Sequence, residues 1–408
     1  MAVDDKHLYV LVTGANSGLG FGILHRLIDS FLLTYPPDTH LTLLFTCRSH
    51  SKKESTLSDL LPLLSTTHGS TWSNRVKLSG RILDLTSLVS IHALSTELHD
   101  DYDIPRLDAV IWNAGMAALS GLDWLTFAKG FVCDTMNTLT YGHYKTQIVG
   151  ARTKAQLEAS STSTSDKTTF HTSSPNGNSP TDTTPEDSTL GEVFCANTFG
   201  HYLLTHLLTP LLAASKFYGP TSVGRIIWVS SLEAFPRFFS TDDIQGLRST
   251  SPYESSKRLT DILSVTSTLP AAEPFVQTFL PTEHNRPRQI LTHPGVCATS
   301  IVTFLPMVLV WCMKIAFLLA KYAGSEYHTT TPYSGAKAMV FAVLARDEEI
   351  RGDVKYGSGN EKIGWFKCRD VLREEKVDFP TKSREEVAHT VWREMELLRV
   401  RFDSLRRR

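Results

Sequence analysis

Short apolar runs alternate with longer amphipathic stretches along the first part of the chain. The runs at 8–12, 41–46, 76–83 and 107–112 predict strands, and the stretches at 18–33, 52–64 and 87–98 predict the helices between them. Strands that alternate with helices at this spacing form βαβ units, whose crossovers are right-handed. The pattern therefore predicts an α/β fold with a doubly wound parallel sheet and helices on both faces.

The apolar pattern stops at about residue 138 and returns at about residue 190. Residues 138–188 are rich in Ser, Thr, Asp, Asn and Pro and offer few side chains to a core, so they predict a solvated low-complexity insertion. Beyond it the pattern predicts a helix at 190–212, a strand at 225–229, a helix at 253–263 and a last core strand at 289–292. The expected organisation is one domain over 1–408 that contains this insertion.

Charge and cysteine content exclude several functions. The chain has 41 Lys and Arg against 42 Asp and Glu, a net charge of -1, which gives no field to hold a nucleic acid. The six cysteines form no C-x-x-C pair, so neither a zinc ribbon nor a disulfide framework is expected, and a reducing, cytosol-facing compartment fits best. The charged start of the chain argues against a cleaved secretory signal.

A glycine-rich turn follows the first predicted strand. Glycines there let the backbone approach a pyrophosphate at the start of a helix, although a tight turn alone would use the same residues. The spacing Gly-x-x-x-Gly-x-Gly, with a threonine before it, resembles the short-chain dehydrogenase/reductase family, which has a Rossmann fold. The resemblance assigns cofactor binding to the residues of this turn, namely Thr13, Gly14, Asn16, Ser17, Gly18, Leu19 and Gly20.

The end of the second strand carries Arg48 where an NAD enzyme usually has an acid. A guanidinium, with Ser49 and Lys52 or Lys53 beside it, pairs with a 2′-phosphate, so NADPH is preferred as cofactor. The alternative is a solvated surface arginine.

Two further segments resemble cofactor contacts of the family. Asp84 follows the third strand, where the family contacts the adenine ring, and it would equally suit an N-cap of the next helix. Asn113, Ala114 and Gly115 follow the fourth strand and resemble the family's Asn-Ala-Gly signature.

Tyr253 and Lys257 stand four residues apart on a predicted helix, so their side chains leave the same face. A free tyrosine has a pKa of about 10, and a neighbouring ammonium favours the phenolate, so the pair can exchange a proton near neutral pH. Many surface helices contain this spacing, and its meaning depends on the surrounding motifs.

Those motifs resemble the family in order and position. A strand at 225–229 ends in Ser230 and Ser231, and the resemblance makes Ser231 the group that holds the reacting oxygen. It makes Asn197 a catalytic residue that kinks its helix and holds a water relaying protons to Lys257. The turn with Pro294, Gly295 and Thr299 is expected to close over the nicotinamide. The family mechanism delivers hydride from NADPH to a carbonyl carbon while Tyr253 protonates the oxygen, and it needs no metal.

Most of the chain outside the insertion resembles the 3-keto-steroid reductases of sterol C-4 demethylation and the related 17β-hydroxysteroid dehydrogenase type 7. The resemblance implies reduction of a 3-keto-4-methyl sterol to its 3β-hydroxyl. Two alternatives stay open: a reductase of another lipophilic ketone, such as a 17-keto steroid or retinal, and a non-catalytic scaffold for membrane sterol enzymes. The intact Ser231, Tyr253 and Lys257 argue against a pure scaffold.

The segment 301–320 is hydrophobic, with Lys314 as its only charge. A spanning helix needs about 20 apolar residues, and a central lysine costs about 2.5–3.5 kcal/mol. Pro306 and Lys314 favour a lid or membrane-associating segment over a crossing, with Phe304, Trp311 and Phe317 inserted, while a core helix or dimer interface is the alternative. We expect a sterol substrate, a membrane surface and other C-4 demethylation enzymes as partners, at the cytosolic face of the endoplasmic reticulum or lipid droplets.

Overall fold

The structure of the protein, a computed structural model, describes residues 6–158, 189–219, 222–282, 284–297, 307–365, 367–379 and 383–404. An eight-stranded sheet forms its centre, in the order β12-β11-β10-β9-β4-β1-β2-β3. Neighbouring strands are parallel throughout, except that β12 is antiparallel to β11. The bounds are β1 (His7–Val12), β2 (His40–Cys47), β3 (Val76–Ile82), β4 (Ala109–Trp112), β9 (Arg225–Val229), β10 (Arg288–His293), β11 (Val354–Gly364) and β12 (Lys367–Lys376).

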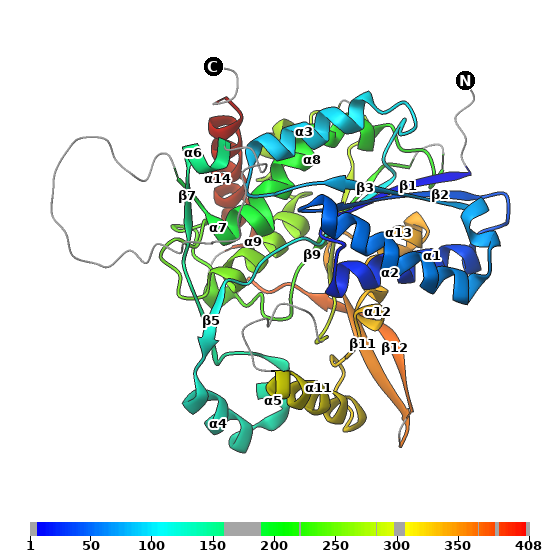
Figure 1. Ribbon diagram of the computed structural model, residues 1–408. Helices are drawn as coiled ribbons and strands as arrows, with labels where there is room; N and C mark the ends of the chain where they lie inside the picture. The colour runs from blue at the N-terminus through cyan, green and yellow to red at the C-terminus, as the bar shows by residue number, and fades with distance from the viewer. Residues whose placement is uncertain are drawn as a thin grey trace, which may run out of the picture.

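Helices cover both faces of this sheet (Figure 1). One core holds α3 (Leu88–Asp100), α8 (Gly200–Ala213), α9 (Pro252–Thr266), α10 (Glu273–Phe279) and α14 (Arg384–Ser404) against the sheet. The second core, on the opposite face, holds α1 (Gly18–Thr34), α2 (His50–His68), α12 (Pro332–Gly335) and α13 (Lys337–Leu344). The doubly wound α/β fold predicted from the apolar pattern is confirmed.

The predicted strands and helices up to β4 form close to their expected bounds. The strands β1 and β2 are buried almost along their whole length, as a parallel sheet covered on both faces requires. Helix α1 turns one apolar stripe, which includes Leu24, Leu27 and Phe31, into the core. The side chain of Ser49 caps α2, and that of Ser87 caps α3.

The strand predicted at 289–292 is confirmed as β10, but it is not the last strand, because β11 and β12 extend the sheet beyond it. Strand β11 has no apolar run, since the residues that it buries include Lys355, Ser358 and Asn360. Each of these polar side chains has a hydrogen-bond partner: Asp261 for Lys355, Gly335 for Ser358 and Ser325 for Asn360. Such a strand carries no hydrophobic signal in the sequence.

The predicted solvated insertion begins too early. Residues 138–158 contain the end of α5 (Thr135–Thr140), β6 (Lys145–Gln147), β7 (Ala151–Thr153) and α6 (Lys154–Glu158). Strand β6 pairs with β5 (Leu119–Leu122), and β7 pairs with β8 (Thr189–Gly191). These partners flank the segment and give its polar backbone hydrogen bonds that its composition does not reveal. The rest of the expected insertion, 159–188, lies outside the described residues.

A lobe below the sheet in Figure 1 contains α4 (Trp124–Cys133), α5 and α11 (Met307–Tyr322). Helix α11 forms most of the hydrophobic segment expected at 301–320, and residues 301–306 lie outside the described part. Among the described residues, no helix has the length and apolar content needed to cross a bilayer. The shorter elements are α7 (Glu192–Phe194), a π-helical turn (Cys195–Phe199) and 3-10 turns at Thr71–Asn74, Pro236–Phe238 and Asp347–Glu349.

Candidate active site

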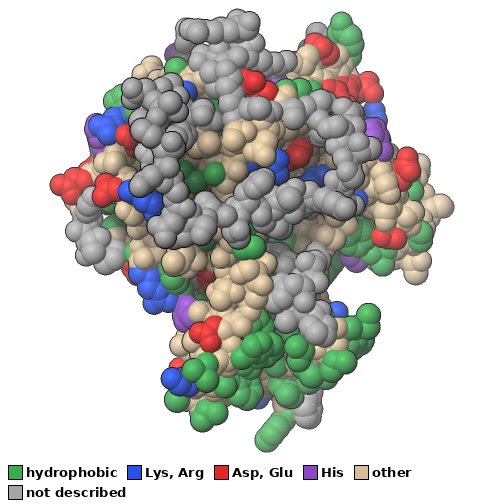
Figure 2. Space-filling model, turned by 60° about the vertical axis from the view of Figure 1, so that its left-hand side comes forward, with side chains coloured by type: hydrophobic (Ala, Val, Ile, Leu, Met, Phe, Trp, Pro, Cys, Tyr) green, Lys and Arg blue, Asp and Glu red, His purple; other side chains and the backbone are tan. Residues whose placement is uncertain are grey.

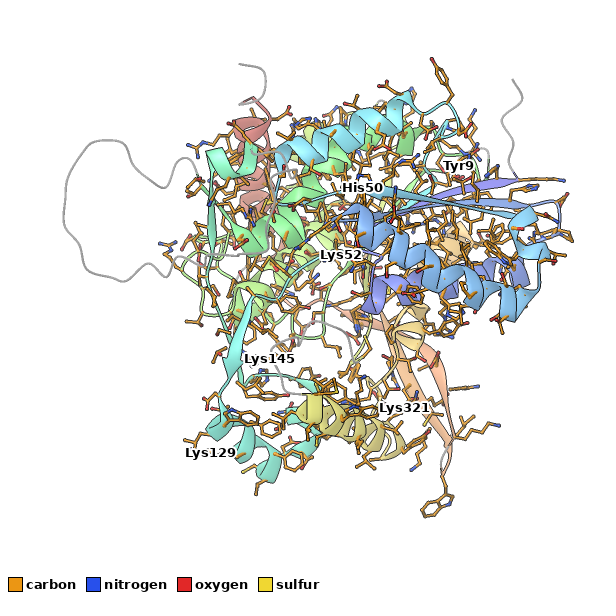
Figure 3. All side chains as sticks on the ribbon, in the orientation of Figure 1. Tyr9, His50, Lys52, Lys129, Lys145 and Lys321 are labelled. Atoms are coloured by element: carbon orange, nitrogen blue, oxygen red, sulfur yellow. The ribbon has the colours of Figure 1, made fainter. Side chains whose placement is uncertain are left out.

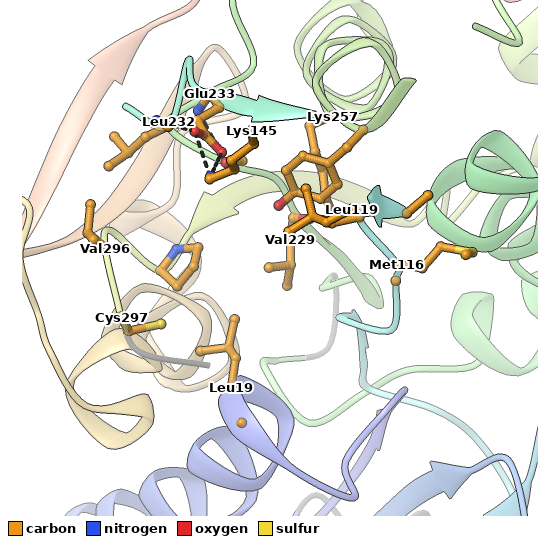
Figure 4. Close-up of a pocket in the computed structure, with 18 of the residues that line it drawn as sticks. Leu19, Met116, Leu119, Lys145, Val229, Leu232, Glu233, Lys257, Val296 and Cys297 are labelled. Atoms are coloured by element: carbon orange, nitrogen blue, oxygen red, sulfur yellow. Dashed lines mark hydrogen bonds and ion pairs between the residues drawn. The ribbon is translucent and has the colours of Figure 1, made fainter. Parts of the chain in front are cut away.

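A cavity of about 980 Å³ opens at the carboxyl ends of β1, β4, β9 and β10 and continues down into the lobe of α4, α5 and α11. Ligands of open α/β sheets bind at this edge, where helices begin and loops meet. Figure 4 shows a part of its wall, with Leu19 from one side, Val296 and Cys297 from another, and Val229 and Lys257 behind.

The glycine-rich turn forms one end of the cavity. Gly14 has a φ of +67°, and a Cβ there would lie 2.8 Å from the Cα of Ala114. A Cβ on Gly20 would lie 2.1 Å from the carbonyl oxygen of Gly14. The cavity is lined here by Gly14, Asn16, Ser17, Gly18, Leu19 and Gly20, as predicted. Because α1 has no side-chain cap and no acid in its first turn, its N-terminus fits a bound phosphate.

Thr13 does not line this cavity, although the family resemblance assigned it to the cofactor. Its side chain is buried, lies 2.9 Å from Nε2 of His201, and accepts the backbone N–H groups of Asn113 and Ala114 at 3.0 and 3.1 Å. Thr13 therefore joins the turn after β1 to the turn after β4. The Thr13 hydroxyl therefore positions the backbone of Asn113 and Ala114, which line the cavity, without lining it itself.

Arg48 follows β2 and lines the cavity together with Lys52. Its side chain is exposed, and Ser49 beside it accepts the backbone N–H of Lys52 as the N-cap of α2. Lys53 packs over Gly80 on the sheet and does not line the cavity. This end of the cavity thus presents two cations and no acid, a charge pattern that suits a phosphate.

Asp84 is placed differently from the family expectation. Its carboxylate accepts the backbone N–H of Thr86 at 2.9 Å and the Thr86 hydroxyl at 2.7 Å, and it does not line the cavity. The neighbouring Leu83 and Leu85 do line it. The N-cap role, which is compatible with an adenine contact, belongs to Ser87, and Asp84 instead fixes the turn before α3. The adenine contact of Asp84 stays a prediction.

Asn113, Ala114 and Gly115 line the cavity beside the glycine turn, as predicted. The amide of Asn113 donates to the carbonyl oxygens of Thr13 and Gly14 at 2.9 and 3.1 Å, which fixes the two turns against each other. A Cβ on Gly115 would lie 2.8 Å from Oδ1 of Asn197. The glycine is therefore needed for the close approach of this loop to the catalytic side of the cavity.

Tyr253, Ser231 and Lys257 meet at the centre of the cavity wall. The side chains of Tyr253 and Ser231 share a hydrogen bond, and Nζ of Lys257 lies 5.8 Å from the centroid of the Tyr253 ring. Lys257 also donates to the carbonyl oxygen of Val229 at 2.8 Å. Ser230 points away, toward Asp261 and the backbone of Lys257. The structure thus brings the predicted catalytic side chains together. Both serines line the cavity, and Ser231, not Ser230, has its hydroxyl on the Tyr253 side chain.

Electrostatics at this wall differ from the sequence expectation. Burial raises the pKa of Tyr253, Glu233 and Glu254 raise it further, and the hydrogen bond from Ser231 lowers it. Burial lowers the pKa of Lys257 to about 8, with Asp261 raising it and Lys355 lowering it. The expected lowering of the Tyr253 pKa by Lys257 is therefore absent, because burial of the phenol has the larger effect.

Asn197 lies in a π-helical turn before α8, an irregularity at the position where the kink was predicted. Its side chain accepts the N–H of Met116 at 2.7 Å and donates to the Met116 carbonyl oxygen and the Ser256 hydroxyl at 3.0 and 2.9 Å. Asn197 thus holds the loop after Gly115 against α9. Its role in a proton relay stays a prediction.

Pro294 and Gly295 line the cavity after β10, as expected for the turn that closes over the cofactor. Thr299, the last residue assigned to that turn, lies outside the described residues.

The lower half of the cavity is apolar and was not predicted residue by residue. Its wall comes from the loop after β4 and from α4, α5 and α11, and includes Met116, Leu119, Leu122, Trp124, Phe127, Phe131, Leu139, Leu309, Met313 and Phe317. Lys145, Glu233 and Glu254 also line the cavity near Tyr253. Lys145 falls in the segment expected to be solvated, and the spacing of these charges along the chain gives no signal of a site.

Comparison with known proteins gives clear relatives in sequence. A 3-keto-steroid reductase of Aspergillus fumigatus is 36% identical and covers 98% of this chain and 94% of its own length. One of Gibberella zeae is 34% identical over 88% of this chain and 79% of its own length, and one of Schizosaccharomyces pombe is 28% identical over 87% and 88%. No protein-family model matches the chain.

Solved structures give only distant similarity. Salutaridine reductase from Papaver somniferum has a TM-score of 0.47 and 16% identity over 85% of this chain and 98% of that one. An NADPH-bound carbonyl reductase from chicken fatty liver has a TM-score of 0.45 and 17% identity over 86% and 96%.

Proposed function

Because the chain belongs to the 3-keto-steroid reductases, we propose that it reduces the 3-keto group of a 4-methyl sterol to a 3β-hydroxyl with NADPH. The observation that supports this activity is the continuity of one cavity. Its glycine-rich end carries Arg48, its centre carries Tyr253, and its other end is an apolar chamber. A dinucleotide and a lipophilic ketone can therefore meet at the phenol.

The cofactor end fits a dinucleotide phosphate in three respects. The close packing at Gly14 and Gly20 brings backbone to the cavity surface, the N-terminus of α1 faces it, and Arg48 and Lys52 supply the positive charge. The residues that would hold NADPH are these, together with Asn113, Pro294 and Gly295. Bound NADPH supplies the hydride that reduces the carbonyl carbon.

The chain's own part in the reaction lies at the carbonyl oxygen. The Tyr253 phenol donates its proton to the carbonyl oxygen as negative charge develops on that oxygen. The Ser231 hydroxyl orients the same oxygen. The shared hydrogen bond of these two side chains sets them at one point of the wall. Lys257 holds positive charge beside the phenol ring and stabilises the phenolate that remains after proton transfer.

The protonation state of Lys257 should make the reaction depend on pH. We expect kcat/KM for NADPH to fall above about pH 8, where this lysine, whose pKa burial lowers to about 8, loses its charge. The pH dependence of kcat/KM reports the ionisable groups of the free enzyme. Tyr253 stays protonated between pH 6 and pH 10, because burial raises its pKa. A pH profile from 6 to 10 measures the effect. Lys257→Arg should flatten it, and a wild-type profile that is level to pH 10 would contradict the assignment.

We place the enzyme at a membrane surface, where its substrate dissolves. Helix α11 turns one side to the cavity, with Leu309, Met313 and Phe317, and the other side outward. On its outer side Trp311 and Leu319 are 62% and 64% exposed. Figure 2 shows hydrophobic side chains gathered over the lower lobe, which contains α4, α5 and α11. A sterol in the outer lipid layer would then reach the chamber without crossing water.

The membrane proposal is tested with Trp311→Glu and Leu319→Glu. Each should reduce co-sedimentation with phosphatidylcholine vesicles several-fold, because a carboxylate on this face resists transfer into lipid. Thr126→Glu, at an exposed position of α4, is a control for added charge on the same lobe. Equal vesicle binding by the wild type and both α11 variants would contradict the proposed membrane face.

A membrane-bound substrate also bears on the location and partners of the enzyme. We propose the cytosolic face of the endoplasmic reticulum or of lipid droplets, in contact with other enzymes of sterol C-4 demethylation that supply the ketone. Co-purification of these enzymes from membranes, lost in the Trp311→Glu variant, would support the contact.

A panel of ketones with both nucleotides tests the reaction itself. The purified chain should oxidise NADPH in the presence of a 3-keto-4-methyl sterol, and more slowly with 17-keto steroids or retinal. Faster turnover of one of the other ketones would replace the sterol assignment, and no turnover with any of them would favour a scaffold.

A further inference from the structure

A charged pair that the mechanism above does not use lies in the cavity wall close to Tyr253. Nζ of Lys145 is 2.9 Å from both carboxylate oxygens of Glu233. Figure 3 places Lys145 above the lower lobe, and Figure 4 shows its bonds to Glu233. The Glu233 side chain is only 11% exposed and also accepts the backbone N–H of Gly142 at 2.6 Å. An ion pair this buried, in a chamber that is otherwise mostly apolar, needs a reason beyond solubility.

The strap that carries Lys145, residues 142–147, binds groups next to the reacting side chains at both of its ends. At one end it binds Glu233, whose own N–H donates to the Ser231 hydroxyl oxygen at 3.1 Å. At the other end Gln147 accepts the backbone N–H of Tyr253 at 2.9 Å and donates to Glu254. The strap therefore joins the Ser231 loop to the first turn of α9.

The charges around the phenol single out Glu233. Tyr253 is faced by Glu233 from the loop after β9, by Glu254 and Lys257 from its own helix, and by Cys297 from the turn after β10. After burial itself, Glu233 has the largest effect and raises the pKa of Tyr253. Burial raises the pKa of the Glu233 carboxyl. Lys145, with smaller contributions from the Gly142 N–H and His143, outweighs burial and keeps this pKa below its usual value, so that Glu233 remains ionised.

We propose that Glu233 and Lys145 form a positioning pair that keeps Tyr253 as a neutral phenol, ready to give a proton to a carbonyl oxygen. The carboxylate disfavours the phenolate, and the ammonium holds the carboxylate in place without cancelling it. The pair acts through Tyr253 and touches no reacting atom. It rests on the proposed function, because its effect is visible only if Tyr253 is the proton donor.

The pair is tested by the pH profile of kcat, which should shift in opposite directions in variants of Glu233 and of Lys145. The changes are made in Lys257→Arg, which lacks the alkaline limb caused by Lys257. In that background Glu233→Gln should move the remaining alkaline limb of kcat for sterol reduction down by about one pH unit, because a charge that opposes ionisation of Tyr253 is removed. In Lys145→Met it should move up by a similar amount, because Glu233 loses its compensating charge. The double variant should match Glu233→Gln, because Lys145 acts on the phenol through Glu233. Asp261 and Lys355, and not Glu233, are the charges that act on Lys257, so a limb that follows Glu233 reports Tyr253.

Controls separate this role from a structural one. Lys77→Met removes the exposed ion pair with Asp103 and should leave the limb unchanged, and Lys145→Arg should retain it. If Lys145→Met does not fold, the test uses Glu233→Gln and Glu233→Asp. The pH midpoint of the alkaline limb should then move in Glu233→Gln and stay unchanged in Glu233→Asp, which keeps the carboxylate. Limbs that stay fixed, or move in the same direction in both single variants, overturn the pair. Absence of ketone reduction by the wild type would instead overturn the proposed function.

Discussion

Replacing Tyr253 with phenylalanine is expected to lower kcat for ketone reduction by about 10²- to 10⁴-fold, the range of a general acid. The phenol is the group at the cavity centre that shares a hydrogen bond with Ser231, and phenylalanine has no proton to give. The ring remains, so the wall keeps its shape. The Kd for NADPH, measured by quenching of protein fluorescence, should therefore change by less than about threefold.

The matched control for this change is Tyr102→Phe, because Tyr102 is fully exposed on the surface. It removes the same hydroxyl group far from the cavity and should turn over ketone at the wild-type rate. Equal rates in Tyr253→Phe and the wild type would show that another group supplies the proton.

Replacing Arg48 with glutamate is expected to raise the Kd for NADPH by about 10²-fold. Hydrogen bonds to charged groups contribute about 1.5–3 kcal/mol, and the new carboxylate adds repulsion to the 2′-phosphate. NADH lacks this phosphate, so its Kd should change by less than about threefold. Titration of the purified variant with each nucleotide gives both constants.

A graded variant strengthens the same experiment. Arg48→Lys keeps the charge but not the two-pronged donor geometry and should weaken NADPH by a smaller factor. Arg346→Glu, at a position 75% exposed and outside the cavity, makes the same change in net charge and should leave both nucleotides unaffected. Parallel losses of NADPH and NADH in Arg48→Glu would contradict the cofactor preference.

The parts of this fold that the sequence predicts well are those with local causes. The strands β1 and β4 are nearly continuous apolar runs, the turn at Gly14 needs glycine because its φ is positive, and the spacing of Tyr253 and Lys257 is a helical repeat. Each signal lies within a few residues of the element that it describes. The candidate catalytic residues Ser231 and Tyr253 also have local signals, since one follows a strand and the other starts a helix at the sheet edge, and their roles stay predictions.

The features that the sequence did not predict depend on contacts between residues far apart in the sequence. Lys145 and Glu233 are 88 positions apart, and only the folded chain shows that one charge is buried against the other. Thr13 and Asp84 have the residue types of the family motif, but neighbouring backbone groups use their oxygens. Strand β11 buries polar side chains whose partners lie on other elements, so it has no apolar pattern.

The most direct test of the central claim follows the hydride. A 3-keto-4-methyl sterol is incubated with the purified chain and NADPH deuterated at C4 of the nicotinamide, and the product is analysed by mass spectrometry and NMR. The proposed reaction predicts a 3β-hydroxysterol that carries one deuterium at C3, formed by the wild type and not by Tyr253→Phe. A recovered ketone without deuterium, under conditions in which NADPH binds, would contradict it.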